Sequence, residues 1–233
     1  MSIWVYILES PSPKDLVGGR YTVTGLESLC RIYGYKSSAF RVLSRAEFES
    51  RLKFIAQTET SNDDWICVHL DCHGDENGIQ MGSDYVSTDN IVEALKPILQ
   101  RDDLRGKFIL IISACFARAL ELPFSLRIDR SLSQLDRSEP RLSLPEYIFF
   151  YDDDLVKYRD AVLSCAILYR SLDRGVTSFL PTSIYDTLKR MARARLGNMI
   201  CHRWDGKANR YRQLYPPLVL GRKVPKHLRN GKV

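Results

Sequence analysis

The 233-residue chain lacks the features of membrane-spanning and secreted proteins. It has no apolar run near the roughly 20 residues that cross a bilayer. Its first residues, MSIWVYILESPSPKD, carry no basic segment ahead of their apolar stretch, so they are typical of a first strand and not of a signal peptide. We therefore expect a cytoplasmic protein with no membrane partner, whose six cysteines are reduced.

Motifs of several enzyme classes are also missing. The stretch LVGGRYTVTG does not end in Gly-Lys-Ser/Thr, which makes a nucleotide phosphate loop a poor interpretation. The stretch SACFA lacks the Gly-x-Ser-x-Gly elbow of serine hydrolases. Cys67, Cys72 and His73 match no zinc spacing, and no second ligand pair follows them. We expect no metal and no other cofactor.

The composition is that of an ordinary globular protein, with 45% hydrophobic and 27% charged residues. The charge is uneven, because residues 186–233 hold 13 Lys and Arg against two Asp, a net charge of +11. The first 185 residues then carry a net charge of −5. This asymmetry fits an acidic partner or nucleic acid, and equally a solvated basic face. No nucleic-acid motif accompanies it, so we do not expect nucleic acid as a partner.

Short apolar runs alternate with amphipathic helical segments along the chain. Strands without polar alternation, separated by helices, indicate a parallel sheet covered on both faces. The expected strands are IWVYIL, SAFRVL, WICVHL, KFILIIS and YIFFY. We expect helices capped by Thr24, Ser44 and Thr88, and later helices over 158–172 and 181–196. The sequence thus predicts a flavodoxin-like three-layer α/β/α sandwich with a mostly parallel sheet.

Two polar regions stand apart from this pattern. The stretch RIDRSLSQLDRSEPRLSLPE, residues 127–146, has few large apolar residues and is expected to be a long, protease-sensitive loop. The basic residues 196–233 are expected to form an extension, with YPPLVLGRK as a possible edge strand. We expect a single domain over 1–233, with its core at about 1–195.

One histidine and one cysteine hold matching places in the predicted sheet. His73 follows the end of WICVHL by three residues, and Cys115 follows the end of KFILIIS by two. The two strands are consecutive members of one βαβ unit, so we expect them side by side, about 4.8 Å apart. Active sites of open parallel sheets lie beyond the carboxyl ends of the strands. Both side chains should therefore emerge at the same edge.

This pairing has a chemical meaning. An imidazole beside a thiol can take its proton and make the thiolate nucleophile. Gly74 allows close backbone approach, and the N–H groups of Gly74 and Cys115 could face a developing oxyanion. Alone, His73 is as well explained as a turn residue and Cys115 as a small buried hydrophobe. Together, at equivalent strand ends, they favour a catalytic interpretation.

The two blocks VHLDCHGDENGI and ILIISACFA, separated by one helix, resemble the His-Gly and Ala-Cys blocks of caspase-like cysteine peptidases. They are similar in particular to prokaryotic caspase-like and CHAT-type proteins. GIQMGSDYVS resembles the family's hairpin, and the resemblance covers about residues 1–195. Phe116 and Ala117 depart from the Arg/Ser-Gly pair that often follows the family's cysteine.

The resemblance implies a caspase-like fold and a cysteine endopeptidase acting on a protein substrate. His73 would be the general base, Cys115 the nucleophile, and the backbones of Gly74 and Cys115 the oxyanion donors. Bacterial members often serve as regulated effectors, including in antiphage defence and cell death, which implies an activating partner protein or small ligand. The alternative is a catalytically silent caspase-like module that binds proteins.

The resemblance also suggests where the substrate side chain binds. Related peptidases place charged groups from the end of the first strand, and from beyond the fifth, in the primary pocket. Here these positions hold Glu9, Asp152, Asp153 and Asp154. An acidic pocket would select Arg or Lys. The competing interpretation is a solvated turn, with acidic residues favoured at a helix N-terminus.

Overall fold

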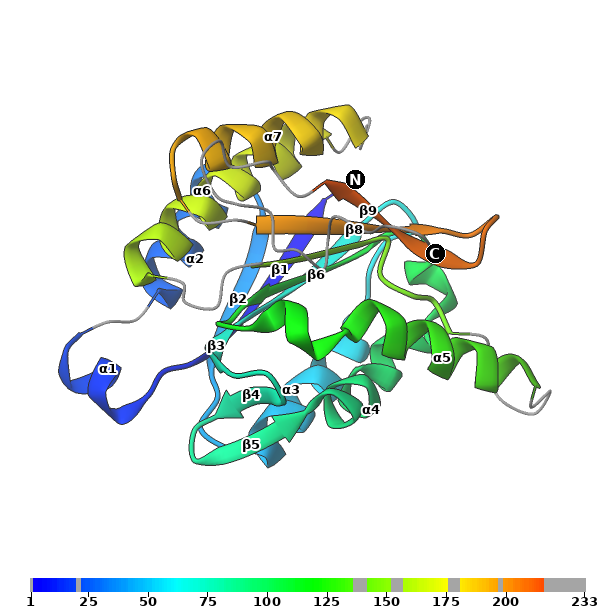
Figure 1. Cartoon of the computed structure of the whole chain (residues 1–233), viewed down its shortest axis with the longest axis horizontal. Coiled ribbons are helices and arrows are strands. Elements are labelled where there is room, and N and C mark those ends of the chain that lie inside the picture. The colour runs from blue at the N-terminus through cyan, green and yellow to red at the C-terminus, as the bar shows by residue number, and fades with distance from the viewer. Residues whose placement is uncertain are drawn as a thin grey trace, which may run out of the picture.

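The protein has a mixed α/β fold, described by a computed structural model over residues 2–19, 22–135, 142–151, 157–175, 181–196 and 199–215 (Figure 1). The strands are β1 (Ile3–Ser10), β2 (Lys36–Arg41), β3 (Trp65–Gly74), β4 (Gly78–Met81), β5 (Asp84–Ser87), β6 (Phe108–Ser113), β7 (Tyr147–Tyr151), β8 (Met199–Asp205) and β9 (Arg210–Tyr215). The helices are α1 (Pro13–Val17), α2 (Val23–Ile32), α3 (Arg45–Ala56), α4 (Thr88–Leu99), α5 (Leu122–Leu135), α6 (Tyr158–Gly175) and α7 (Pro181–Arg193), with 3₁₀ turns η1 (Asp102–Leu104) and η2 (Ala117–Leu120).

The central sheet runs in the order β2-β1-β3-β6-β7-β8-β9. The strand pairs β2–β1, β1–β3, β3–β6 and β6–β7 are parallel. The pairs β7–β8 and β8–β9 are antiparallel. The strands β4 and β5 form a separate hairpin on the end of β3. The expected adjacency of β3 and β6 is confirmed, and it places the carboxyl ends of these two strands together.

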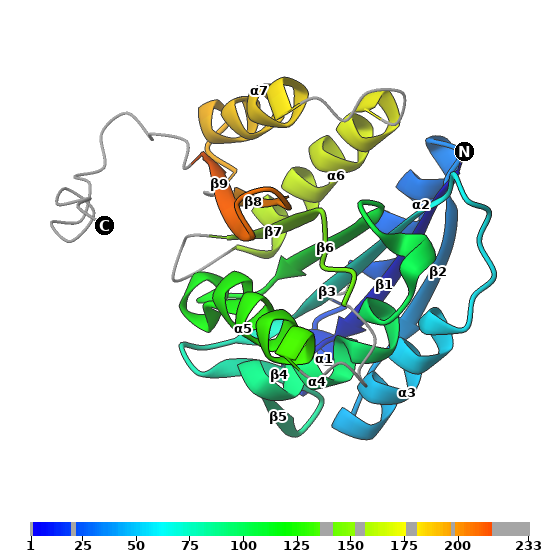
Figure 2. The same ribbon diagram turned by 90° about the vertical axis from the view of Figure 1, so that its right-hand side faces the viewer.

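Helices cover both faces of the sheet, which confirms the three-layer α/β/α prediction. On one face, α3, α4 and α5 pack on side chains such as Leu8, Val68 and Leu110. On the other, α2, α6 and α7 pack on alternate residues of the same strands, such as Ile7 and Ile109. Figures 1 and 2 show the two helical layers on opposite sides of the strands. Since successive strand side chains point to opposite faces, apolar runs such as FILIIS supply both cores.

Two of the three predicted helix caps are displaced. The α2 helix begins at Val23 with Thr22 in the cap position, so the predicted Thr24 cap is wrong. The cap of α4 is Ser87, whose side chain accepts a hydrogen bond from Asn90 N–H, one residue before the predicted Thr88. The Ser44 cap of α3 is confirmed, with its side chain accepting from Glu47 N–H. Ser87 and Thr88 are adjacent in the sequence, and the path of the chain from β5 into α4 decides which of them caps the helix.

The predicted loop over 127–146 is wrong for residues 127–135, which are helical, whereas residues 142–146 belong to no helix or strand. Residues 122–135 form α5, and Leu142 and Leu144 are buried. The apolar stripe of α5 runs through Leu122 and Leu126 to Arg130, one position every four residues. Arg130 is only 6% exposed, stacks on Trp204 at 5.0 Å and donates from Nη1 to Leu142 O at 2.8 Å. A buried arginine therefore occupies a core position of the stripe, and this is why the segment resembled a polar loop.

The sheet continues beyond residue 195. Strands β8 and β9 form a hairpin that pairs with β7. Their charged side chains, such as Arg203 and Arg212, made this region resemble a solvated tail, whereas an antiparallel edge hairpin tolerates such residues on its open side. The suggested edge strand at 215–223 lies, beyond its first residue, outside the described residues. Among the described helices, none is long and apolar enough to cross a membrane.

The β4–β5 hairpin is fixed against the main sheet through Gly82 in its turn. Gly82 has a φ of +63°, and its N–H donates to Ser10 Oγ at 2.7 Å. A Cβ atom at this position would lie 1.8 Å from the backbone oxygen of Leu43. Glycine is thus required at position 82 for two reasons: the backbone is left-handed, and another chain segment approaches closely.

We expect Gly82→Ala to lower the free energy of unfolding by more than the roughly 1–2 kcal/mol that a left-handed conformation costs a non-glycine residue. The excess comes from displacing the Leu43 backbone. Gly106→Ala is the matched control, because Gly106 has a φ of +71° but nothing within 4 Å of its added Cβ. Urea denaturation of both variants measures the difference, and equal losses would contradict the packing role of Gly82.

Candidate active site

The candidate site lies where the adjacent strands β3 and β6 end. Their parallel register pairs Asp71 with Ser113, and two further residues along each strand lead to His73 and Cys115. A Cβ atom on Gly74 would stand 2.8 Å from the carbonyl oxygen of Cys115. The two chain segments are therefore in backbone contact at this point, and only a glycine fits between them.

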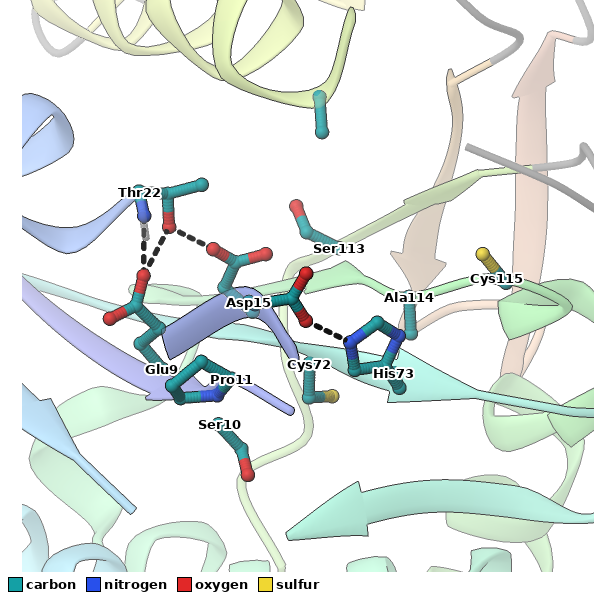
Figure 3. Close-up of a pocket in the computed structure, with 12 residues that line it drawn as sticks. Glu9, Ser10, Pro11, Asp15, Thr22, Cys72, His73, Ser113, Ala114 and Cys115 are labelled. Carbon is teal, nitrogen blue, oxygen red and sulfur yellow. Dashed lines mark hydrogen bonds and ion pairs between the residues drawn. The ribbon is translucent and has the colours of Figure 1, made fainter. Parts of the chain in front are cut away.

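A hollow of about 110 Å³ opens at this edge, and we call it the strand-end hollow. Its lining residues come from the ends of β1, β3 and β6 and from α1, α6 and the α2 cap: Glu9, Ser10, Pro11, Asp15, Thr22, Asp71, Cys72, His73, Ser113, Ala114, Cys115 and Ala161. The structure thus brings His73, Cys115 and Glu9 to one hollow (Figure 3). Asp152, Asp153 and Asp154 lie outside the described residues.

His73 belongs to β3 itself and not to a turn. At this level the strand pairs with β4, with His73 opposite Gln80 and Gly74 opposite Ile79. This pairing fixes the backbone on either side of the imidazole, while the side chain remains 50% exposed. The ring is therefore anchored by its strand and open to a ligand.

Asp15, which the sequence did not single out, is the hydrogen-bond partner of His73. Its Oδ2 atom lies 2.6 Å from His73 Nε2. The carboxylate is held by a capping box at the start of α1, because Oδ2 also accepts from Ser12 N–H at 3.2 Å and from Ser12 Oγ at 2.5 Å. Burial raises the pKa of Asp15, but the hydrogen bonds from Ser12 and His73 lower it by more. The pKa of Asp15 therefore lies below its ordinary value. Asp15 is thus an ionised acceptor for Nε2–H.

With Nε2 occupied by Asp15, the other ring nitrogen of His73 remains for chemistry. Figure 3 shows Nδ1 on the side of the ring that faces Ala114, with Cys115 beyond it. A neutral imidazole that donates from Nε2 carries a lone pair on Nδ1. The ring edge that carries Nδ1 therefore faces away from Asp15 and toward Ala114.

Glu9, Thr22 and Asp71 form a carboxyl cluster on the floor of the hollow. Glu9 is 2% exposed, and its Oε1 accepts hydrogen bonds from the backbone N–H groups of Thr22 and Val23. The Thr22 hydroxyl contacts carboxyl oxygens of both Glu9 and Asp71. Since a hydroxyl has one proton to donate, a proton on one of the two carboxyl groups completes the pair of hydrogen bonds.

The proton of this cluster belongs on Asp71. Burial raises the pKa of Asp71 to about 7, against the opposing hydrogen bond with Thr22, and the negative charge of Glu9 adds to the rise. Glu9 lies at the N-terminus of α2, where its Oε1 is held by two backbone N–H groups. Its other oxygen, Oε2, is buried without a hydrogen-bond partner among the described residues. Asp71 contacts the Thr22 hydroxyl and Asp84 accepts from Arg45 N–H, whereas the hydrogen-bond partner of His73 is Asp15.

The turn that carries Cys115 is strained at the next residue. Phe116 has a φ of +55°, in the left-handed region that favours glycine. This is the position where the chain departs from the Arg/Ser-Gly pair of the caspase-like family. Glu121, at the other end of η2, has a φ of +46°. Non-glycine residues in this conformation cluster at functional sites, where the surrounding structure sustains the strain.

A second histidine–cysteine pair lies beneath the hollow, between β3 and α6. His69 Nε2 is 3.8 Å from Cys165 Sγ and 2.8 Å from Ser113 Oγ, and Nδ1 is 2.7 Å from the Tyr169 hydroxyl. Burial lowers the pKa of His69 to about 3 and raises the pKa of Cys165 to about 12. Both groups therefore stay neutral at pH 7 and out of reach of a substrate, so this pair is part of the core.

Other cysteines of the described residues pack in or against the two hydrophobic cores. Cys30 and Cys165 are buried in α2 and α6. Cys67 packs on the α2–α6 face, whereas Cys72 packs against the α3–α4–α5 face. The two sulfurs thus lie on opposite sides of β3 and cannot share an ion.

Asp71→Asn is expected to stabilise the protein at alkaline pH. A carboxyl group whose folded pKa lies above its ordinary value contributes stability that is complete below pH 4 and is lost as pH rises through 7. Asparagine removes this loss, so we expect the Tm of the variant to exceed that of the wild type by about 2–4 °C at pH 8, equivalent to about 1 kcal/mol. Near pH 4 the two should coincide. A constant difference across the pH range would contradict this assignment.

Comparison with known proteins finds similarity to solved structures. No family model matches the sequence, and no curated protein matches it. Among solved structures, the chain is similar to the crystal structure of caspase-1 from Spodoptera frugiperda, with a TM-score of 0.49 and 17% sequence identity. The match covers 81% of this chain and 76% of that chain.

Proposed function

We propose that the protein is a cysteine endopeptidase of the caspase-like kind, which hydrolyses peptide bonds of a protein substrate through Cys115 and His73. The observation that carries the proposal is that both residues line one hollow, at the ends of neighbouring parallel strands. Both side chains are at least partly exposed, so a substrate can reach them. The buried pair His69 and Cys165 offers no comparable access.

In the proposed reaction, His73 Nδ1 takes the proton from Cys115 Sγ, and the thiolate attacks the carbonyl carbon of the peptide bond. The resulting tetrahedral intermediate collapses as the imidazolium gives its proton to the leaving amine, and a thioester remains on Cys115. A water molecule, deprotonated by His73, then attacks the thioester and releases the acid. Proton transfer requires Nδ1 and Sγ to approach to about 3 Å.

The backbone around Gly74 supports an oxyanion site. We assign its two donors to the N–H groups of Gly74 and Cys115. The close contact of Gly74 with the Cys115 carbonyl brings the two peptide segments together. Donors fixed by backbone need no rearrangement when the oxyanion forms, and this preorganisation is a large source of catalytic power.

Cys115→Ala and His73→Ala are each expected to reduce peptide cleavage on the order of 10²–10⁴-fold while leaving the fold intact, because each removes a reacting group at an accessible site. Cys72→Ala is the matched control, since Cys72 lines the same hollow and packs with its sulfur against the core. It should retain nearly full activity. Cleavage of a fluorogenic peptide library, with circular dichroism to check folding, makes the comparison.

A folded Cys115→Ala variant that cleaves at the wild-type rate would refute the nucleophile. The alternative, a silent caspase-like module that binds proteins, draws support from the strained Phe116 beside Cys115. Iodoacetamide separates the two functions without any substrate. A peptidase should alkylate faster at Cys115 in the wild type than in His73→Ala at pH 7, whereas a silent module should show equal rates.

Asp15 acts in this proposal as a positioning residue for His73. Asp15→Asn should lower kcat about 10- to 100-fold with a smaller change in KM, because the imidazole loses the acceptor that fixes its tautomer. The rise of Cys115 alkylation with pH should also move to higher pH. The control is Asp84→Asn, since Asp84 lies near His73 but accepts from Arg45 N–H. An unaltered alkylation profile in Asp15→Asn would contradict the role.

The carboxyl cluster supports a preference for substrates with Arg or Lys before the cleaved bond. Glu9 Oε2 is a buried acceptor with no hydrogen-bond partner among the described residues, and it lines the same hollow as Cys115. A guanidinium or ammonium group would provide the missing donors through charge-assisted bonds. An acidic side chain would instead be repelled.

A positional-scanning peptide library tests this preference. We expect basic residues to dominate the position before the cut, and Glu9→Gln to reduce the preference at least about tenfold while Cys115 alkylation stays unchanged. Gln keeps an acceptor for the Thr22 and Val23 N–H groups, so α2 retains its cap. A clear preference for Asp or for an uncharged residue would overturn the assignment and leave the Cys115–His73 dyad standing. A contribution of Asp152, Asp153 and Asp154 remains part of the proposal.

The resemblance to prokaryotic caspase-like and CHAT-type proteins extends the proposal to a biological role. A regulated bacterial effector, in antiphage defence or cell death, would require an activating partner protein or small ligand. A proteome-wide cleavage profile of the wild type against Cys115→Ala, with and without candidate partners, would identify both substrate and trigger.

A further inference from the structure

A second hollow lies between η2 and the start of α5 on one side and the β8–β9 hairpin on the other, and we call it the arginine hollow. It measures about 400 Å³, within the range of small-ligand sites. None of the residues that line it lines the strand-end hollow. Figures 1 and 2 show α5 and the hairpin beside one another at the end of the sheet that β9 closes.

Three guanidinium groups from three different elements line this hollow. Arg118 belongs to η2, Arg127 to α5 and Arg210 to β9. Glu121 is the one carboxylate among the residues that line it. The positive charge is thus in excess and converges on one place from both walls. Guanidinium groups so placed attract a phosphate or another anion with several acceptor oxygens.

Aromatic side chains provide the second feature of the arginine hollow. Phe124 is 51% exposed, which is unusual for a phenylalanine, and Arg127 stacks above its ring at 5.3 Å. Tyr211 lies in the opposite wall, where its hydroxyl donates to Pro145 O and its ring rests edge-on against Trp204. An exposed ring beside arginines is suited to stack on a planar group of a ligand.

His202 adds an unsatisfied polar atom. Its Nδ1 is buried and has no hydrogen-bond partner in the part of the chain that the structure describes. Burial, helped by the charge of Arg118, lowers the pKa of His202 to about 4, so the ring is neutral at pH 7. A neutral imidazole does not add to the positive charge. It offers a hydrogen bond to an uncharged polar group, such as the edge of a base.

We propose that the arginine hollow binds a nucleoside phosphate, with the phosphate held by Arg118, Arg127 and Arg210 and the base stacked on Phe124 within reach of His202. The size of the hollow suits one nucleotide. An acidic peptide would use the arginines but would leave the exposed ring and the buried imidazole nitrogen without a role. Inorganic phosphate alone would likewise use only part of the site.

The position of the arginine hollow connects it with the Cys115 turn. Arg118 lies three residues after Cys115, and η2 is bounded by the left-handed residues Phe116 and Glu121. A ligand bound to Arg118 and α5 would contact the strained segment that follows Cys115. The binding itself does not depend on the proposed peptidase activity, because it can be measured on a protein with no active cysteine.

Calorimetric titration of the whole chain with ribonucleoside 5′-monophosphates and 5′-diphosphates tests the proposal. We expect at least one to bind with a Kd below about 1 mM. Arg127→Gln and Arg210→Gln should each weaken its binding at least about tenfold, since each removes a charge-assisted contact. Phe124→Leu should weaken the nucleotide about fivefold or more and leave inorganic phosphate unaffected, because only a base can stack.

Arg51→Gln is the matched control, since Arg51 also stacks on a phenylalanine, Phe40, at 4.9 Å, but outside the hollow. It should bind as the wild type does, and so should Cys115→Ala. The proposal is overturned if no nucleotide binds below about 1 mM, or if both arginine variants bind normally. It is equally overturned if inorganic phosphate or an Asp/Glu-rich peptide binds as tightly as the best nucleotide.

Discussion

The parallel pairing of β3 with β6 is the contact on which the candidate site depends. Its register puts Asp71 opposite Ser113, so the chain beyond each strand leaves the sheet at the same level. Gly74 then lies against the Cys115 carbonyl with no space for a side chain. A shift of the register by one residue would turn His73 toward the opposite face, because strand side chains alternate. The continuous apolar runs of both strands, buried on two faces, hold that register.

Burial separates the pair His69 and Cys165 from the pair His73 and Cys115. His69 and Cys165 are fully enclosed between the sheet and α6, and desolvation keeps both neutral. Their hydrogen bonds with Ser113 and Tyr169 satisfy polar groups in a closely packed core. His73 lies only four residues along the same strand, yet it emerges beyond the helices that cover His69. Distance between a histidine and a cysteine is thus a weaker criterion than their access to water and substrate.

The charged groups of the molecule are likewise separated into two places. Carboxyl groups from β1, β3 and α1 gather around the strand-end hollow, and arginines from η2, α5 and β9 gather around the other. The turn after Cys115 joins the two, with left-handed residues at both of its ends. An acidic hollow beside the proposed nucleophile and a basic one behind its turn would attract ligands of opposite charge. Under the two proposals above, this separation would let a peptide substrate and a nucleoside phosphate bind without competing.

The sequence by itself determined the strands and helices that a local pattern of residues specifies. Apolar runs predicted the strands β1, β2, β3, β6 and β7, and the positions of His73 and Cys115 after two such runs predicted that they lie at one edge. Periodicity failed for α5, because the buried Arg130 takes a position in its stripe, and for β8 and β9, whose arginines resemble those of a tail.

Only the tertiary structure decided which groups surround the two strand ends. Asp15 reaches His73 from a five-residue helix that lies 58 positions earlier in the chain, a contact that no local pattern encodes. Glu9 was expected as a pocket carboxylate, and it also caps α2 through one of its oxygens. The arginine hollow depends on packing between α5 and the edge hairpin. Each of these is a long-range contact, fixed by how the layers pack and not by the residues next to it in the chain.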